Sequence, residues 1–150
     1  MFKKSHIKPE FQPLLDKFPE FFLELSDTAK HYDGDCNLRY GFECEGGWVN
    51  ILENHFEKIR NLLAEANKSG IECNYKACIL KEKFGTCEDQ GDFKSNDKEM
   101  VLKYWKLSDE LRSDSSKTCE ITGRAGKTLK NGRGWVKTLC LEEAERLEYR

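Results

Sequence analysis

Two short motifs bracket a glycine-rich, basic segment near the C-terminus of this chain. The first motif holds Cys119 and Thr122, and the second holds Cys140 and Glu143. Two C-x2-C knuckles at such a separation form a zinc ribbon, in which they face each other across a short hairpin and hold one metal tetrahedrally. The spacing therefore predicts a zinc-ribbon-like hairpin within residues 117–150, followed by a short acidic helix.

Half of the usual zinc ligands are replaced in this chain. A threonine hydroxyl is a poor zinc ligand, and glutamate binds zinc only occasionally, so Thr122 and Glu143 leave an incomplete ligand set. We therefore expect a hairpin without zinc, held by hydrogen bonds and by the packing of Trp135. No other cofactor is expected.

Length and charge limit the possible organisation and partners. A chain of 150 residues with 38% hydrophobic content can bury one ordinary core. We expect an α+β body over residues 1–113, with the hairpin and helix of residues 117–150 packed on it, or alternatively one domain overall. The net charge is −2 although 35% of the residues are charged, so binding of nucleic acid would need a local basic patch.

The sequence predicts a cytoplasmic protein with free thiols. No apolar run reaches the length of a membrane span, and the N-terminus leads into Pro9 instead of an apolar signal core. The seven cysteines are odd in number and no signal peptide accompanies them. We expect them to be reduced and mostly packed as small hydrophobic side chains.

Periodicity predicts three helices in the body. Proline spacing indicates a short helical turn and then a helix that starts near Pro19. Apolar residues from Trp48 onward recur every three or four positions until Gly70, which predicts an amphipathic helix that ends there. Asn96 and Glu99 have the spacing of a capping box, which predicts a third helix followed by a polar linker over residues 113–117.

A hairpin is predicted between the second and third helices. Apolar and polar residues alternate from Ile71 to Ile79, which is the period of a strand. Phe84 and Gly85 can form the turn. The return segment, residues 86–92, is polar, so we expect a short or frayed strand there.

Three segments of the chain carry a resemblance to known proteins. They are GFECEGGW (residues 41–48), KEKFGT (residues 81–86), and a segment that begins with CEITG at Cys119 and ends with GWVKTLC at Cys140. In these segments the chain resembles small proteins encoded by bacterial viruses and prophages. The resemblance implies a viral origin and an α+β body followed by a four-cysteine ribbon, whose second and fourth positions are Thr122 and Glu143 here.

The histidines do not indicate a catalytic site. His6, His31 and His55 lie in separate segments. His31 and Cys36 are close in sequence, but nucleophilic catalysis requires a specific geometry that sequence proximity does not supply. We expect a protein that is not an enzyme, in which His55 borders the apolar face of its helix.

The first candidate binding surface is basic. Residues 117–137 hold six basic residues and one acidic residue, and four glycines allow close approach of a partner. Such a hairpin could lie along phosphates, with Trp135 available to stack on a base. Alternatively, it is a solvated turn balanced by the acidic C-terminal residues. The candidate contact residues are Arg124, Lys127, Lys130, Arg133, Trp135 and Lys137.

The second candidate surface is an acidic loop formed by Glu88, Asp89 and Asp92. Carboxylates on a rigid body can occupy a basic groove of an enzyme that handles nucleic acid and so exclude its substrate. The spacing is not that of a calcium loop. The alternative is a solvated loop without a partner.

These observations predict a phage-type binding protein that acts in the cytoplasm of a host. Its partner would be a host protein or ribonucleoprotein, such as a nucleic-acid-targeting defence complex. The alternative is a weak nucleic-acid-binding module that uses the basic hairpin of residues 117–137. Neither interpretation involves a membrane.

Overall fold

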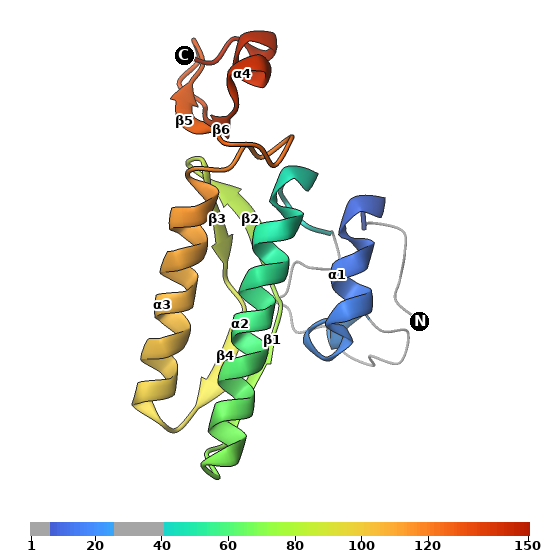
Figure 1. Ribbon diagram of the computed structural model, residues 1–150, viewed down its shortest axis with the longest axis vertical. Helices are drawn as coiled ribbons and strands as arrows, with labels where there is room; N and C mark the ends of the chain where they lie inside the picture. Colours follow the sequence, from blue (N-terminus) through green and yellow to red (C-terminus); the bar gives the residue numbers. More distant parts are fainter. Residues whose placement is uncertain (1–6, 26–40) are drawn as a thin grey trace.

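Two long helices lie against a long β-hairpin in the computed structural model, which describes residues 7–25 and 41–150 (Figure 1). The helices are α2 (Val49–Lys68) and α3 (Lys98–Ser115). The architecture is α+β, as the sequence predicted. His6, His31 and Cys36 lie outside the described residues.

Helix α2 agrees with its predicted bounds. Its apolar face is buried, and Trp48, Leu52, Phe56 and Ile59 are fully enclosed. The helix ends just before Gly70, whose φ of +68° is the left-handed conformation in which glycine commonly terminates helices. The 3.6-residue period was therefore a reliable signal here.

Helix α3 begins and ends differently from the prediction. Asp97, not Asn96, is the N-cap, and its carboxylate accepts the Met100 N–H at 3.1 Å. At the other end the helix continues through Ser113 to Ser115 instead of giving way to a linker. The buried Ser115 hydroxyl holds this last turn, because it accepts the Cys87 N–H at 2.7 Å and donates to the Arg112 carbonyl.

The hairpin consists of four short strands, β1 (Cys73–Lys76), β2 (Leu80–Lys83), β3 (Thr86–Asp89) and β4 (Asp92–Ser95). Strand β2 pairs with β3 and β1 pairs with β4, both antiparallel, so the four form one hairpin interrupted in the middle. The predicted strand from Ile71 to Ile79 is wrong at Ala77, whose N–H donates to the Phe21 carbonyl at 2.8 Å. The polar return segment contains the short strand β3, as expected, and β3 packs on α3.

The N-terminal segment covers one side of this core. It contains the short helix α1 (Gln12–Lys17) and 3-10 turns at Pro9–Phe11, Pro19–Phe21 and Leu23–Leu25. The helix predicted to start near Pro19 is therefore wrong, since only single turns occur there. The aromatic side chains of this segment are buried, and Phe18, Phe21 and Phe22 all contact Phe56 of α2.

Residues 117–150, here called the C-terminal unit, sit at one end of the long axis (Figure 1). The unit contains β5 (Lys127–Lys130) paired with β6 (Val136–Leu139), followed by α4 (Leu141–Leu147). Its small hydrophobic cluster is separate from the main core and contains Cys119, Leu139, Cys140 and Ala144.

The C-terminal unit is bonded to the body at two places. Gly47 N–H donates to the Glu120 carbonyl at 2.7 Å, and a side chain on Gly47 would lie 2.4 Å from that oxygen. The Trp48 indole donates to the Thr118 carbonyl at 2.9 Å. On the other side, the Thr138 hydroxyl donates to the Gly85 carbonyl at 2.6 Å.

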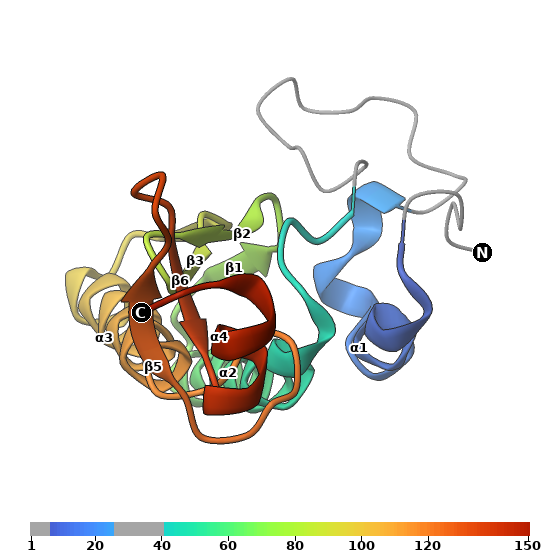
Figure 2. The same cartoon turned by 90° about the horizontal axis from the view of Figure 1, so that it is seen from above.

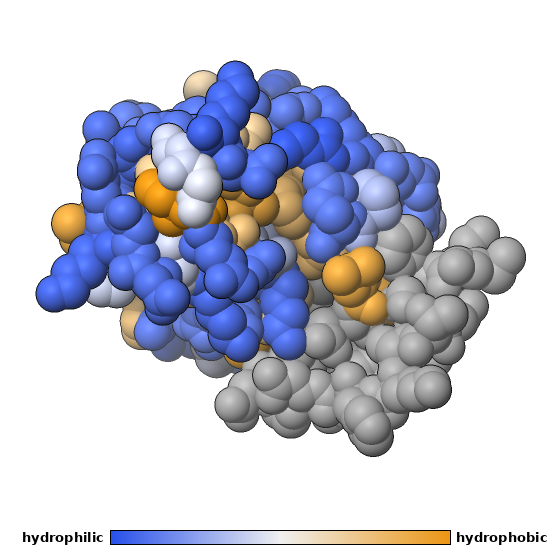
Figure 3. All heavy atoms as spheres, turned by 90° about the horizontal axis from the view of Figure 1, so that it is seen from below, coloured by the Kyte–Doolittle hydropathy of each residue, from blue (hydrophilic) through white to orange (hydrophobic). Residues whose placement is uncertain are grey.

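The opposite end of the molecule is mainly hydrophilic. Figure 3 shows this face, on which hydrophobic side chains form small separate groups. Among the described residues, no helix is both long enough and apolar enough to cross a membrane.

Candidate functional site

Asp89 of the predicted acidic loop lies in the core. Only 7% of Asp89 is exposed, and its Oδ2 atom lies 2.8 Å from both His55 Nε2 and the Tyr75 hydroxyl. The Gly91 N–H donates to the other carboxylate oxygen. Burial first, and then the Asp89 charge, raise the pKa of Tyr75. The exposed position predicted for Asp89 is wrong, because this carboxylate ends a strand that faces the helices.

The other two carboxylates of that loop are engaged separately. Glu88 pairs with Arg112 of α3 at 3.0 Å, and only 16% of its side chain is exposed. Asp92 begins β4 and pairs with Lys94 at 3.1 Å. Glu88, Asp89 and Asp92 therefore do not form a common acidic surface, which removes the geometric basis of that candidate site.

His55 also differs from its predicted position. It lies inside the core with 3% exposure instead of at the edge of an apolar face. The Tyr104 and Ser108 hydroxyls are buried as well, and neither has a hydrogen-bond partner among the described residues. This polar cluster joins α2, α3 and the hairpin.

Thr122 lies between the two thiols of the C-terminal unit. Its N–H is 3.5 Å from Cys119 Sγ, and its hydroxyl is 3.7 Å from Cys140 Sγ. Glu143 instead accepts a hydrogen bond from Arg146 at 2.7 Å. In the part of the chain that the structure describes, no three His, Cys, Asp or Glu side chains are grouped to hold a metal ion.

The Cys119 thiol is stabilised in its charged form. Burial alone would raise its pKa, but hydrogen bonds from the Thr122 side chain and from the N–H groups of Cys140, Thr122 and Ile121 outweigh burial and lower the pKa. These N–H to sulfur contacts resemble those in the C-x2-C knuckle of a zinc ribbon. Because Cys119 is fully buried, this thiol is not accessible to a substrate.

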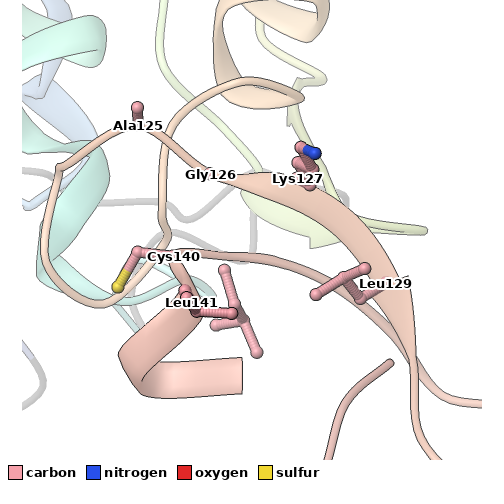
Figure 4. Close-up of a pocket in the computed structure, with 7 residues that line it drawn as sticks. Ala125, Gly126, Lys127, Leu129, Cys140 and Leu141 are labelled. Carbon is pink, nitrogen blue, oxygen red and sulfur yellow. The ribbon is translucent and has the colours of Figure 1, made fainter. Parts of the chain in front are cut away.

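An apolar hollow of about 400 Å³ lies beside Cys140 (Figure 4). Leu129 and Leu141 approach it from β5 and from the start of α4. Its other lining residues are Ala125, Gly126, Lys127, Leu139 and Cys140. Its lining includes one amine and one thiol and no acid or imidazole.

The loop of the β5–β6 hairpin has a fixed conformation. Asn131 Oδ1 accepts the N–H groups of Arg133 and Trp135, each at 2.9 Å. The Asn131 N–H donates to the Trp135 carbonyl at 3.0 Å. One asparagine thus closes the whole loop by local hydrogen bonds, which is a common role for this residue type.

Trp135 points away from the core of the C-terminal unit. Its exposed fraction is 67%, so the prediction that Trp135 packing holds the hairpin is wrong. Leu139 fills that core instead, together with Cys119 and Ala144. The closed loop leaves Trp135 available to a partner.

Two of the five predicted basic contact residues already have acidic partners. Lys137 pairs with the buried Glu120 at 2.8 Å, and this partner raises the pKa of Lys137 although burial opposes it. Arg124 pairs with Glu142 at 2.7 Å. The acidic C-terminal residues therefore neutralise only a part of the basic hairpin.

The other three basic residues remain available. Lys127, Lys130 and Arg133 are exposed, and none has an acidic partner among the described residues. These three residues and Trp135 all lie on the β5–β6 hairpin, with Lys127 and Lys130 on opposite faces of β5, and we call the set the hairpin surface. Cations without an acidic partner can bind phosphates without first breaking an ion pair within the protein.

Sequence reasoning missed Phe84. It occupies the first position of the two-residue turn between β2 and β3, with φ of 52° and 75% exposure. The left-handed conformation costs a non-glycine residue about 1–2 kcal/mol, and an exposed ring gains little packing in return. An aromatic residue just before glycine at a hairpin turn was the available signal.

A comparison with known families, with curated proteins and with solved structures found no match to this chain. The resemblance to proteins of bacterial viruses therefore stays a prediction. So does the expected action on a host defence complex.

Proposed function

We propose that the protein is a non-enzymatic nucleic-acid-binding protein that uses the hairpin surface. The observation that carries this proposal is the set of three cations without acidic partners beside an exposed tryptophan. Cations of this kind supply the sequence-independent part of nucleic-acid affinity, because each phosphate contact releases a counterion. The tryptophan offers a flat apolar face to a base.

The loop geometry supports this assignment. Side chains on Gly132 or Gly134 would meet no atom within 4 Å, so the backbone of the loop is open to a partner. The hydrogen bonds of Asn131 fix the loop before binding, which reduces the ordering cost of association.

The core chemistry supports a role without catalysis. His55 is the one histidine among the described residues, and it is buried against Asp89. A general base must reach the proton that it removes, and this imidazole is enclosed by the helices.

Charge reversal tests the proposal. The triple variant Lys127→Glu, Lys130→Glu, Arg133→Glu should lose at least about tenfold in affinity for a fluorescein-labelled oligonucleotide at low salt. The slope of log affinity against log salt should flatten by about 2, since roughly 0.7–0.9 is lost for each phosphate contact. Fluorescence anisotropy over a salt series measures both quantities.

A triple variant of equal net charge is the control. Lys68, Lys98 and Lys106 are exposed on the two long helices, away from the hairpin surface. Their replacement by glutamate should change affinity much less than the hairpin variant does. Equal losses in both variants, or no binding by the natural sequence at low salt, would overturn the proposed function.

A further inference from the structure

We propose that the ligand is single-stranded nucleic acid and that Phe84 is a second stacking platform of the same site. The site would then extend from the hairpin surface onto the β2–β3 turn. This inference rests on the proposed function and identifies the class of nucleic acid that the site binds.

The β2–β3 turn holds Phe84 rigidly outward. Lys83 lies opposite Thr86 in the register, so Phe84 and Gly85 alone form the turn, and both have positive φ. The Gly85 N–H donates to the Glu82 carboxylate at 2.7 Å, and the Thr86 hydroxyl donates to the Lys83 carbonyl. Asparagine, aspartate or glycine would suit the first position better, so folding alone does not explain a phenylalanine there.

The turn is attached to the hairpin that carries Trp135. A Cβ on Gly85 would lie 2.9 Å from Thr128 and 3.3 Å from Val136. Gly85 follows Phe84, and Val136 follows Trp135. Because adjacent Cα atoms are 3.8 Å apart, the Cα atoms of the two aromatic residues are separated by no more than roughly 15 Å. A few nucleotides of an extended strand can span that distance.

The two elements also project on the same side. Figure 2 shows that the β5–β6 loop extends over the side of the molecule on which β2 lies. Lys130 lies opposite Val136 in the register, and alternation places it on the same face of β5 as Thr128. The hairpin face that meets Gly85 therefore carries one of the free cations.

A fourth free cation lies beside Phe84. Lys83 Nζ is 6.0 Å from the centroid of the Phe84 ring, and Lys83 is exposed without an acidic partner among the described residues. Two aromatic rings and two lysines thus lie on adjoining segments. Channels for single strands have this composition, because the rings stack on bases while the cations follow the phosphates.

The aromatic residues select against a duplex. Bases in a duplex are stacked on each other and offer only their edges, whereas unstacked bases offer a whole face to an aromatic side chain. Phe84 and Trp135 can form such contacts only with a single strand. A duplex could use only the cations.

Phe84→Asn separates a binding role from a structural one. Asparagine tolerates the left-handed conformation, so the melting temperature should stay the same or rise. Affinity for a 15-nucleotide single strand should fall about tenfold, which is typical of the loss of one stacked base. The salt slope should remain that of the natural sequence, because no phosphate contact is removed.

Two matched variants and three probes complete the experiment. Phe84→Trp should keep the affinity, and Leu102→Asn, which changes another exposed hydrophobic residue, should not affect it. The probes are a DNA strand, an RNA strand of the same sequence and the DNA duplex. The natural protein should bind one or both single strands at least about tenfold more tightly than the duplex, and the two strands distinguish DNA from RNA as the source.

The failures of the two proposals are distinguishable. If Phe84→Asn binds the single strand as the natural sequence does, while charge reversal at the hairpin surface abolishes binding, this inference is wrong and the proposed function stands. Equal affinity for strand and duplex would also overturn it. Absence of binding to all three probes would overturn both.

Discussion

Single residues decide how the segments of this chain begin and end. Asp97 is the best example, because two adjacent side chains are both good helix caps and only one of them acts. The Ser95 hydroxyl accepts the Asp97 N–H at 3.2 Å, which places Asp97 at the helix start and Asn96 in the preceding turn. The sequence pattern predicted the start of α3 to within one residue but named the wrong cap. The residue that caps the helix depends on where the preceding strand ends.

Replacement of Asp97 by alanine should cost about 1 kcal/mol of unfolding free energy, because the Met100 N–H loses its acceptor. Asn96→Ala is the matched control and should change stability by less than about 0.5 kcal/mol. Urea denaturation followed by circular dichroism compares them. A larger loss for Asn96→Ala would mean that the cap lies one residue earlier.

At the scale of elements, periodicity predicted the helices better than the hairpin. Steps of three and four identified α2 because its buried face is apolar apart from His55. The polar composition of β3 did not show how its carboxylates are held, since Asp89 and Glu88 are satisfied by His55 and Arg112, which are distant in sequence. No local pattern reveals such partners. For the same reason, the exposed acidic site was wrong, whereas the basic hairpin, which is a local feature, is present.

The hairpin strands should make the protein sensitive to alkaline pH. A hydrogen bond with Cys44, and then burial, raise the pKa of Cys87 well above 9.0, and burial raises that of Tyr75 well above 10.0. Both groups stay neutral in the folded state but ionise in the unfolded chain. The unfolded state therefore binds fewer protons, and stability should fall as pH rises above about 9.

The loss between pH 8 and pH 10.5 should be on the order of 2 kcal/mol for Cys87 alone. Urea midpoints across this range measure it. The Cys87→Ala variant starts from a lower stability but should show a smaller decline with pH. An equal decline in both proteins would assign the effect to other groups.

At the scale of the whole molecule, the C-terminal unit depends on the body for its position. Its own core is small, and its contacts with Gly47, Trp48 and Gly85 fix its orientation. The sequence predicted that such a unit exists and packs on the body. The sequence did not reveal the contacts at Gly47 and Gly85, because a glycine that permits close backbone packing is recognised only once the neighbouring segment is known.

Gly47→Ala should destabilise the protein by about 2–3 kcal/mol, because the new methyl group would meet two carbonyl oxygens at 2.4 Å. Gly132→Ala is the control, since a side chain there meets open space. Thermal melting followed by near-ultraviolet circular dichroism is the measurement. Similar melting temperatures for the two variants would show that Gly47 is not tightly packed against the C-terminal unit.

The bond between the Thr138 hydroxyl and the Gly85 carbonyl has a kinetic consequence. It ties the β2–β3 turn to strand β6, which is far away in sequence, so the spacing between that turn and the β5–β6 loop is set before any encounter with a ligand. Capture then need not wait for either loop to rearrange. Its speed would be governed by diffusion and by long-range attraction between opposite charges.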